Sequence, residues 1–223
     1  MKKKELAVKI SFSVLGVALA GVSVGFLKLA AMGVDPFQAM MAGLNAVIPI
    51  PFGTLYAIVG LLLLCFSFFV DRHYVGLASI ITLTIQGYII DFAKDILFSL
   101  FPEAVLGVRV VSFIIGIVLL CFATAIYFTA DLGVSAYDAI SLIITNTWKK
   151  GKFRYNRIMT DCVCVILGSV TYLISGGTFA SLTSIVGIGT IVTAFCMGPL
   201  VDFFQTKVVT PAYRSILGQT HKC

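Results

Sequence analysis

The chain has 223 residues and a formal net charge of +6, and 59% of its residues are hydrophobic while only 12% are charged. Soluble domains carry about 25% charged residues, so this composition excludes an ordinary water-soluble protein. The basic residues gather in residues 1–9, in 149–157 and from 207 onward, as in cytoplasmic loops of a membrane protein, so they do not indicate a nucleic-acid-binding surface.

The first predicted element is a long helix over residues 10–30. The basic residues before it imitate the start of a cleavable signal peptide. The apolar run continues unbroken from Ile10 to Leu27, however, which is close to the roughly 20 residues that a membrane-spanning helix needs. The sequence therefore predicts a retained first transmembrane helix.

A break at Gly33 is followed by a predicted short helix over residues 36–48. Asp35 is a good N-cap residue, Pro36 suits the first helical position, and Gln38 stands where a capping box needs it. The prolines in 49–51 end this helix, because proline cannot continue it. Two further spans are predicted over residues 53–70 and 75–97.

The second half of the chain repeats the first. Residues 33–38 align with 133–138 at an offset of 100, and residues 76–92 align with 187–203 at an offset of 111. The same elements are therefore predicted again: a long helix over 108–130, a short helix over 136–148 capped by Ser135 and closed by Asp138, and spans over 156–175 and 184–204. One membrane domain, residues 1–223, would consist of repeat 1 (about 1–104) and repeat 2 (about 105–223).

The number of crossings depends on the two short helices. A helix of about 13 residues is about 20 Å long, less than the roughly 30 Å hydrocarbon core. If the short helices do not span, six crossings result and the repeats are inverted; if they span, eight result and the repeats are parallel. The charge distribution fits both. Helix length favours an all-α protein with six transmembrane helices and two half or re-entrant helices. The basic residues at both ends of the chain favour cytoplasmic termini.

Two motifs carry a family resemblance. These are the repeated Gly-Val-(Ser/Asp)-(Pro/Ala)-aromatic element at 33–37 and 133–137, and the segment from Gly187-Ile188-Gly189-Thr190 to Gly198-Pro199 and on to Phe204. They resemble the YczE/YyaS/YitT family of bacterial integral membrane proteins over nearly the whole chain. The first half departs from the pattern, with 76–79 reading Gly-Leu-Ala-Ser and Tyr88 in place of proline. The resemblance implies a bacterial inner membrane and a permease-like or accessory role, without a substrate.

Residues at the two helix breaks are the candidate substrate site. Half-helices would carry Asp35 and Asp138 to membrane depth, where free N–H groups and the helix dipole favour anionic groups of a ligand. The alternative is that both residues only cap the helices. The proposed substrate-binding residues are Asp35, Gln38, Asn45, Gln86, Ser135, Tyr137 and Asp138.

The remaining polar and small residues have structural interpretations. Asp161 is expected near the membrane interface, paired with Arg154 or Arg157, and Asp91 and Asp202 near helix ends beside Lys94 and Lys207. Small residues allow close helix packing. Gly187, Gly189 and Gly198 are expected to serve such packing, with direct ligand contact as the alternative. The whole predicted structural motif comprises Gly33, Gly133, Gly187, Gly189, Gly198 and Pro199.

Two functions remain open: a small secondary transporter for a polar or amphipathic molecule, or a membrane accessory protein. The accessory protein would bind a protein partner, or a second copy of the chain, with the basic loop 149–157 as its contact. An enzyme is not expected, because no histidine lies in a predicted span and no cysteine cluster has metal-ligand spacing. The sequence therefore predicts no catalytic residue, metal or cofactor, and the lipid bilayer as the principal environment.

Overall fold

The computed structural model describes residues 3–151 and 153–217 and is helical throughout, with no strand in that part of the chain. Residues 1–2, 152 and 218–223, which include parts of the three basic segments, lie outside the described residues.

Six helical segments are long and apolar enough to cross a membrane, as predicted. Two of them are interrupted by a π-helical turn, η2 (Thr82–Gln86) between α4 (Leu77–Ile81) and α5 (Gly87–Leu100), and η4 (Gln205–Val209) between α10 (Ile188–Phe204) and α11 (Thr210–Ile216). The other four spans belong to α1 (Lys3–Ala30), α3 (Phe52–Val70), α6 (Leu106–Ala130) and α8 (Phe153–Ile174). The six-span, all-α architecture is confirmed.

The last span is longer than predicted. It was expected over residues 184–204 and extends instead from Ile188 to Ile216. Pro211 does not end it, because this proline lies in the first turn of α11, after the π-helical turn, where a missing N–H is tolerated. Asp202 consequently lies inside the span rather than near its end.

The short helix α2 (Pro36–Val47) is not among the helices that are long enough to cross a membrane. Its 12 residues are about 18 Å long. The Lys28 ammonium, near the end of α1, lies 3.6 Å from the ring centroid of Phe52, at the start of α3. The elements before and after α2 therefore meet on one side of the molecule, and α2 returns to the side from which the chain entered.

The equivalent helix α7 (Ala136–Leu142) and its π-helical turn η3 (Ile143–Thr147) behave in the same way. Before α7, the Leu132 carbonyl accepts from the Ala78 N–H at 3.0 Å. After it, the Thr147 hydroxyl donates to Asp71 at 2.6 Å. Both ends thus lie against the start of α4 or the connection between α3 and α4, which includes the 3-10 turn η1 (Arg72–Tyr74).

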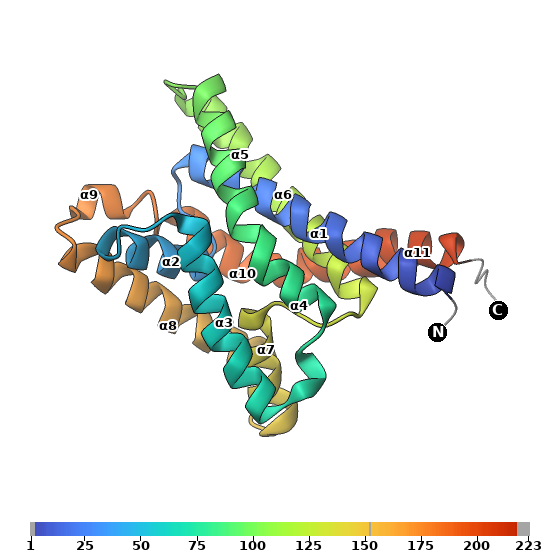
Figure 1. Cartoon of the computed structure of the whole chain (residues 1–223). Helices are drawn as coiled ribbons and strands as arrows, with labels where there is room; N and C mark the ends of the chain where they lie inside the picture. The colour runs from blue at the N-terminus through green and yellow to red at the C-terminus, as the bar shows by residue number, and fades with distance from the viewer. Residues whose placement is uncertain (1–2, 152, 218–223) are drawn as a thin grey trace.

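The two long helices α1 and α6, which occupy equivalent places in the two halves, pack antiparallel along their length (Figure 1). A Cβ on Gly16 would lie 3.0 Å or less from Ala123 and Tyr127, and a Cβ on Gly116 would lie near Ser23 and Leu27. The start of α1 and the end of the last span lie at the same end of the molecule, where the rings of Phe12 and Tyr213 are 5.3 Å apart.

The loops before the short helices share their backbone geometry. The φ angles are 49° at Ala31 and 51° at Asp131, and 102° at Gly33 and 101° at Gly133. A Cβ on Gly33 would lie 2.7 Å from the Gly187 nitrogen, and one on Gly133 would lie 2.6 Å from the Gly76 nitrogen. Both the positive φ and the close approach therefore require glycine at 33 and 133.

Each of the two loops also accepts an equivalent hydrogen bond from the start of a span in the other half of the chain. Gly189 N donates to Met32 O at 2.7 Å, as Ala78 N donates to Leu132 O, so Gly187 and Gly189 pack closely, as predicted. The Thr190 and Ser79 hydroxyls each accept from the glycine N–H three residues earlier. The repeat stays a prediction, and these paired features and the antiparallel long helices support its inverted form.

Candidate functional site

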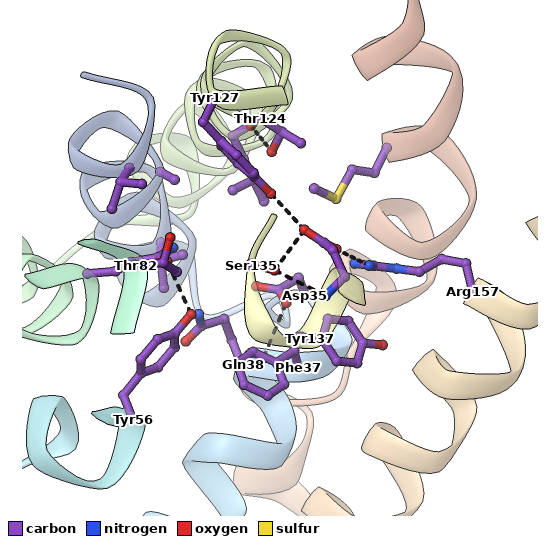
Figure 2. A pocket seen from close by; sticks show the side chains of 17 residues that line it. Asp35, Phe37, Gln38, Tyr56, Thr82, Thr124, Tyr127, Ser135, Tyr137 and Arg157 are labelled. Atoms are coloured by element: carbon purple, nitrogen blue, oxygen red, sulfur yellow. Dashed lines mark hydrogen bonds and ion pairs between the residues drawn. The ribbon is translucent and has the colours of Figure 1, made fainter. Parts of the chain in front are cut away.

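The N-terminal ends of α2 and α7 meet at the centre of the molecule. The rings of Phe37 and Tyr137, in the first turns of these helices, stack with centroids 4.8 Å apart and planes 15° apart. Figure 2 shows the polar side chains that surround this stack, which come from the short helices and from several spans.

Both predicted N-caps are present. Asp35 accepts from the Gln38 N–H at 3.2 Å, and Ser135 Oγ accepts from the Asp138 N–H at 3.1 Å. The side chains of Gln38 and Asp138, which were expected to close the two capping boxes, make other contacts. Gln38 faces a cavity, and the Asp138 carboxylate accepts from the hydroxyls of Ser135 and Tyr127, each at 2.7 Å.

A buried ion network joins α7 to α8. The Arg157 guanidinium contacts Asp138 through Nη1, and its Nε lies 3.4 Å from Asp161. The Tyr137 hydroxyl donates to Asp161, and the guanidinium carbon lies 4.4 Å from the centre of the Tyr137 ring. The charged and polar groups of these four side chains are therefore paired with one another between α7 and α8.

The predicted pairing of Asp161 with Arg157 is confirmed, and its expected place near the membrane interface stays a prediction. The side chain of Asp161 is only 7% exposed, because it is covered by Tyr137 and by the arginine. The side chain of Arg154, the other predicted partner, lies outside the described residues.

A small cavity of about 60 Å³ lies beside the stacked rings (Figure 2). Six of the seven predicted site residues line it: Asp35, Gln38, Gln86, Ser135, Tyr137 and Asp138. Asn45 does not. It lies at the far end of α2, where its amide donates to the carbonyls of Ile48 and Ile50 at 3.3 and 2.7 Å. These carbonyls lie beyond the helix end and need a donor, which explains the position of Asn45.

Sequence reasoning missed several polar residues of this cavity. Tyr56 and Tyr127 lie in apolar runs of the sequence; Tyr56 donates to Gln86 at 3.2 Å. Arg157 was assigned to the cytoplasmic loop. The available signal was polar groups within apolar helices, and Thr82 and Thr124 share it.

A larger cavity of about 510 Å³ adjoins the small one. Its walls come mainly from α6, α8 and α10 and are largely apolar, for example at Phe128, Ile158 and Phe195. The two cavities share five lining residues, namely Asp35, Thr124, Asp138, Arg157 and Met197. A molecule in the large cavity would therefore contact the polar centre directly.

Gly198 lines the large cavity with Pro199, so its predicted role in close packing is wrong. A Cβ at Gly198 would meet nothing within 4 Å. At the equivalent position in the first half, a Cβ on Gly87 would lie 2.7 Å from the Gly53 Cα. The cleft between α8 and α10 is therefore open, whereas α3 and α5 are in close contact.

Asp91 and Asp202 lie four residues after Gly87 and Gly198. They differ in the same way, because one is packed and the other lines the cavity. Asp91 accepts from the Gly53 N–H at 3.0 Å and so caps α3; it is not paired with Lys94, which instead contacts Asp95 at 3.3 Å. Its equivalent Asp202 lines the large cavity, and it forms no ion pair among the described residues. Among the described residues, neither aspartate is thus paired with the lysine that lies near it in the sequence.

Comparison with known proteins gives a family and two relatives. Residues 7–206 match the model of a family described as "Family of unknown function (DUF6198)". The chain is 23% identical to the uncharacterized protein YyaS of Bacillus subtilis (strain 168), over 87% of this chain and 90% of the relative. It is 24% identical to the uncharacterized membrane protein YczE of the same organism, over 90% and 87%.

No solved structure matches the chain significantly. The matches to YyaS and YczE confirm the resemblance noted from the sequence motifs. Together with the six apolar spans, they establish a multi-pass membrane protein. Since the family model covers most of its length, the chain belongs to the DUF6198 family.

Proposed function

We propose that this protein is a small secondary transporter that moves a polar or amphipathic small molecule across the bacterial inner membrane. The transported molecule would bind at the small cavity between the two halves. The observation that carries the proposal is the one-sided access to this site: the α8–α10 cleft is open beside Gly198, and the equivalent α3–α5 cleft is closed at Gly87.

The open side corresponds to the cytoplasm in this proposal. The large cavity reaches Arg157, the last residue of the basic segment 149–157, and Ile158, which follows it. Short loops rich in Lys and Arg face the cytoplasm in most membrane proteins. Both termini would lie on this side, and the structure would correspond to an inward-open state.

The transport cycle follows from the relation between the halves. Inverted-repeat transporters hold the substrate at broken helices near the midplane and expose it alternately by moving one part against another. In the outward-open state α3 and α5 would separate at Gly53 and Gly87, and α10 would close on α8. The cycle needs no catalytic chemistry in the chain.

The test compares cysteines at the equivalent positions 91 and 202 in a cysteine-free background. Asp91→Cys and Asp202→Cys are labelled with a membrane-impermeant thiol reagent in vesicles of either orientation. Without an imposed gradient, position 202 should react from the cytoplasmic side and position 91 should be protected. A proton gradient or membrane potential that favours the other state should raise labelling at 91 from outside and lower it at 202.

The accessory role predicts a different labelling pattern. A static membrane protein would keep the reactivity of both positions constant under every gradient, and reciprocal changes would not occur. Constant labelling would therefore overturn the transport proposal and favour a protein that presents segment 149–157 to a partner.

A further inference from the structure

We infer that the ligand of the central site is an amphipathic organic cation, whose ammonium or similar head occupies the small cavity while its apolar part lies in the large one. The inference rests on the proposed transport function, because it specifies the substrate class of the same site. Charge, hydrogen bonding, aromatic surface and cavity shape each support it.

The charges of the site favour a cation. Four carboxylates line the two cavities, against one guanidinium, Arg157; they are Asp35, Asp138, Asp161 and Asp202. That guanidinium already contacts two of the carboxylates. An anionic ligand would have to displace a carboxylate from Arg157 and leave it unpaired in a poorly solvated site, which is costly. A cation instead balances the excess negative charge.

Two side chains on the wall of the small cavity carry oxygen atoms that can accept further hydrogen bonds. Gln38 is only 3% exposed, it lines the small cavity, and its Oε1 atom has no hydrogen-bond partner. Asp35, on the same cavity wall, accepts from the Gln38 N–H at 3.2 Å, and its two carboxylate oxygens can accept further hydrogen bonds. Buried acceptors without donors are unfavourable, so a ligand that brings N–H groups would satisfy both.

Aromatic rings complete the wall. Phe37, Tyr56, Tyr127 and Tyr137 all line the small cavity. Aromatic faces attract ammonium and guanidinium groups, most strongly where water is excluded. Arg157 over the ring of Tyr137 is one such contact at this site. A cationic head beside Phe37 or Tyr56 would gain a similar attraction.

The two volumes define the shape of the ligand. A cavity of about 60 Å³ holds a head group of only a few heavy atoms, since one water occupies about 30 Å³ of liquid. The adjoining cavity of about 510 Å³ lies within the range of small-molecule sites. Its walls are mainly apolar, so a hydrocarbon or aromatic body fits it better than a metal ion or a small polar solute.

The experiment compares three probes of similar size on the purified full chain: phenethylammonium, neutral 2-phenylethanol and anionic 3-phenylpropanoate. Binding is measured by titration calorimetry. The ammonium should bind at least tenfold more tightly than the other two. Asp35→Asn should weaken ammonium binding at least tenfold, because asparagine keeps the N-cap but removes the charge. Asp95→Asn, an exposed carboxylate paired with Lys94, is the control and should leave it unchanged.

Tighter binding of the anion, no binding of the ammonium at millimolar concentration, or equal ammonium affinity in Asp35→Asn and the parent would each overturn the inference. If Asp35→Asn does not fold, Gln38→Leu, which removes the unpartnered acceptor, replaces it with the same expected loss. The labelling of positions 91 and 202 is measured without a probe. Reciprocal labelling without ammonium binding would therefore reject the cation and leave transport standing.

Discussion

Phe37 and Tyr137, which are 100 residues apart in the chain, stack on one another with ring centroids 4.8 Å apart. Each follows an N-cap by two residues, so the contact joins equivalent points of the two short helices. If the halves are inverted repeats, the axis that relates them passes close to this contact. The stack also forms one wall of the small cavity, so it links the fold directly to the site.

The stack should couple the two halves energetically. A double-mutant cycle with Phe37→Leu and Tyr137→Leu should give a coupling free energy of about 0.5–1.5 kcal/mol, the range of aromatic pairs. The measurement is thermal or denaturant unfolding in detergent. Tyr137→Phe is the control, because it keeps the ring and removes only the hydroxyl contacts with Asp161 and Thr160. Additive effects of the two leucine variants would contradict the prediction.

Removal of the Arg157 side chain should destabilise the protein strongly. Arg157→Met leaves Asp138 and Asp161 without their cation, and breaking a buried ion pair costs about 3–5 kcal/mol. The free energy of unfolding should fall by an amount of this order. A triple variant that adds Asp138→Asn and Asp161→Asn should recover much of the loss, because no uncompensated charge remains. A triple variant less stable than Arg157→Met would rule out this explanation.

Local sequence was sufficient for the number of spans and for the caps, although not for the end of the last span. Asp35 and Ser135 were identified as caps because the bonds concerned join residues three apart. The contact between Arg157 and Asp138 could not be predicted in this way, since it depends on how α8 packs beside α7. Asn45 was misassigned because composition does not distinguish an amide in a cavity from one that binds nearby carbonyls.

The glycine pair shows a second limit. Gly87 and Gly198 occupy equivalent sequence positions, yet one is packed and the other faces a cavity. A repeated sequence pattern predicts the same helix twice, but whether a cleft is open depends on the positions of neighbouring helices. Sequence alone could therefore locate the centre of the site and could not show which side has access to it.

This difference predicts unequal effects of the same substitution. Gly87→Ala places a Cβ 2.7 Å from the backbone of Gly53, and overpacking of this kind typically costs about 1–3 kcal/mol. Gly198→Ala places the methyl group in open space and should change the free energy of unfolding by less than about 0.5 kcal/mol. Thermal unfolding in detergent compares the two variants. Similar destabilisation by both would show that the α8–α10 cleft is closed in the membrane protein as purified.

The contact between Asp71, at the end of α3, and Thr147, in η3, should contribute less to stability at acid pH. Hydrogen bonds from the Thr147 hydroxyl and the His73 N–H lower the pKa of the exposed Asp71 carboxyl. The ordinary pKa is about 3.9. A lowered folded-state pKa adds stability that is present above this value and is lost as pH falls through the folded-state pKa.

Thr147→Val should therefore raise the pKa of Asp71 toward its ordinary value. Carbon NMR of the labelled aspartate side chains follows the titration directly. Thr145→Val is a suitable control, because that hydroxyl donates to the Ser141 carbonyl and does not contact Asp71. An unchanged Asp71 titration in Thr147→Val would assign the lowered pKa to the His73 N–H instead.

Two exposed loop positions distinguish six crossings from eight. With six crossings and a cytoplasmic N-terminus, position 72 faces the cytoplasm and position 103, between α5 and α6, faces outside. With eight crossings, both assignments reverse. In a cysteine-free background, Arg72→Cys should react with an impermeant thiol reagent only in inside-out vesicles, and Glu103→Cys only in right-side-out vesicles.

The structure favours the first outcome for a physical reason. Helix α2 is too short to cross the membrane. The contact between Lys28 and Phe52 also holds the end of α1 and the start of α3 on the same side of the molecule. The reverse labelling would require α2 to span the bilayer and would place Asp35 near the cytoplasmic or outer surface. Its carboxylate would then be hydrated, and a central site for a cation would lose its anionic partner. The labelling pattern thus tests the depth of the site as well as the topology.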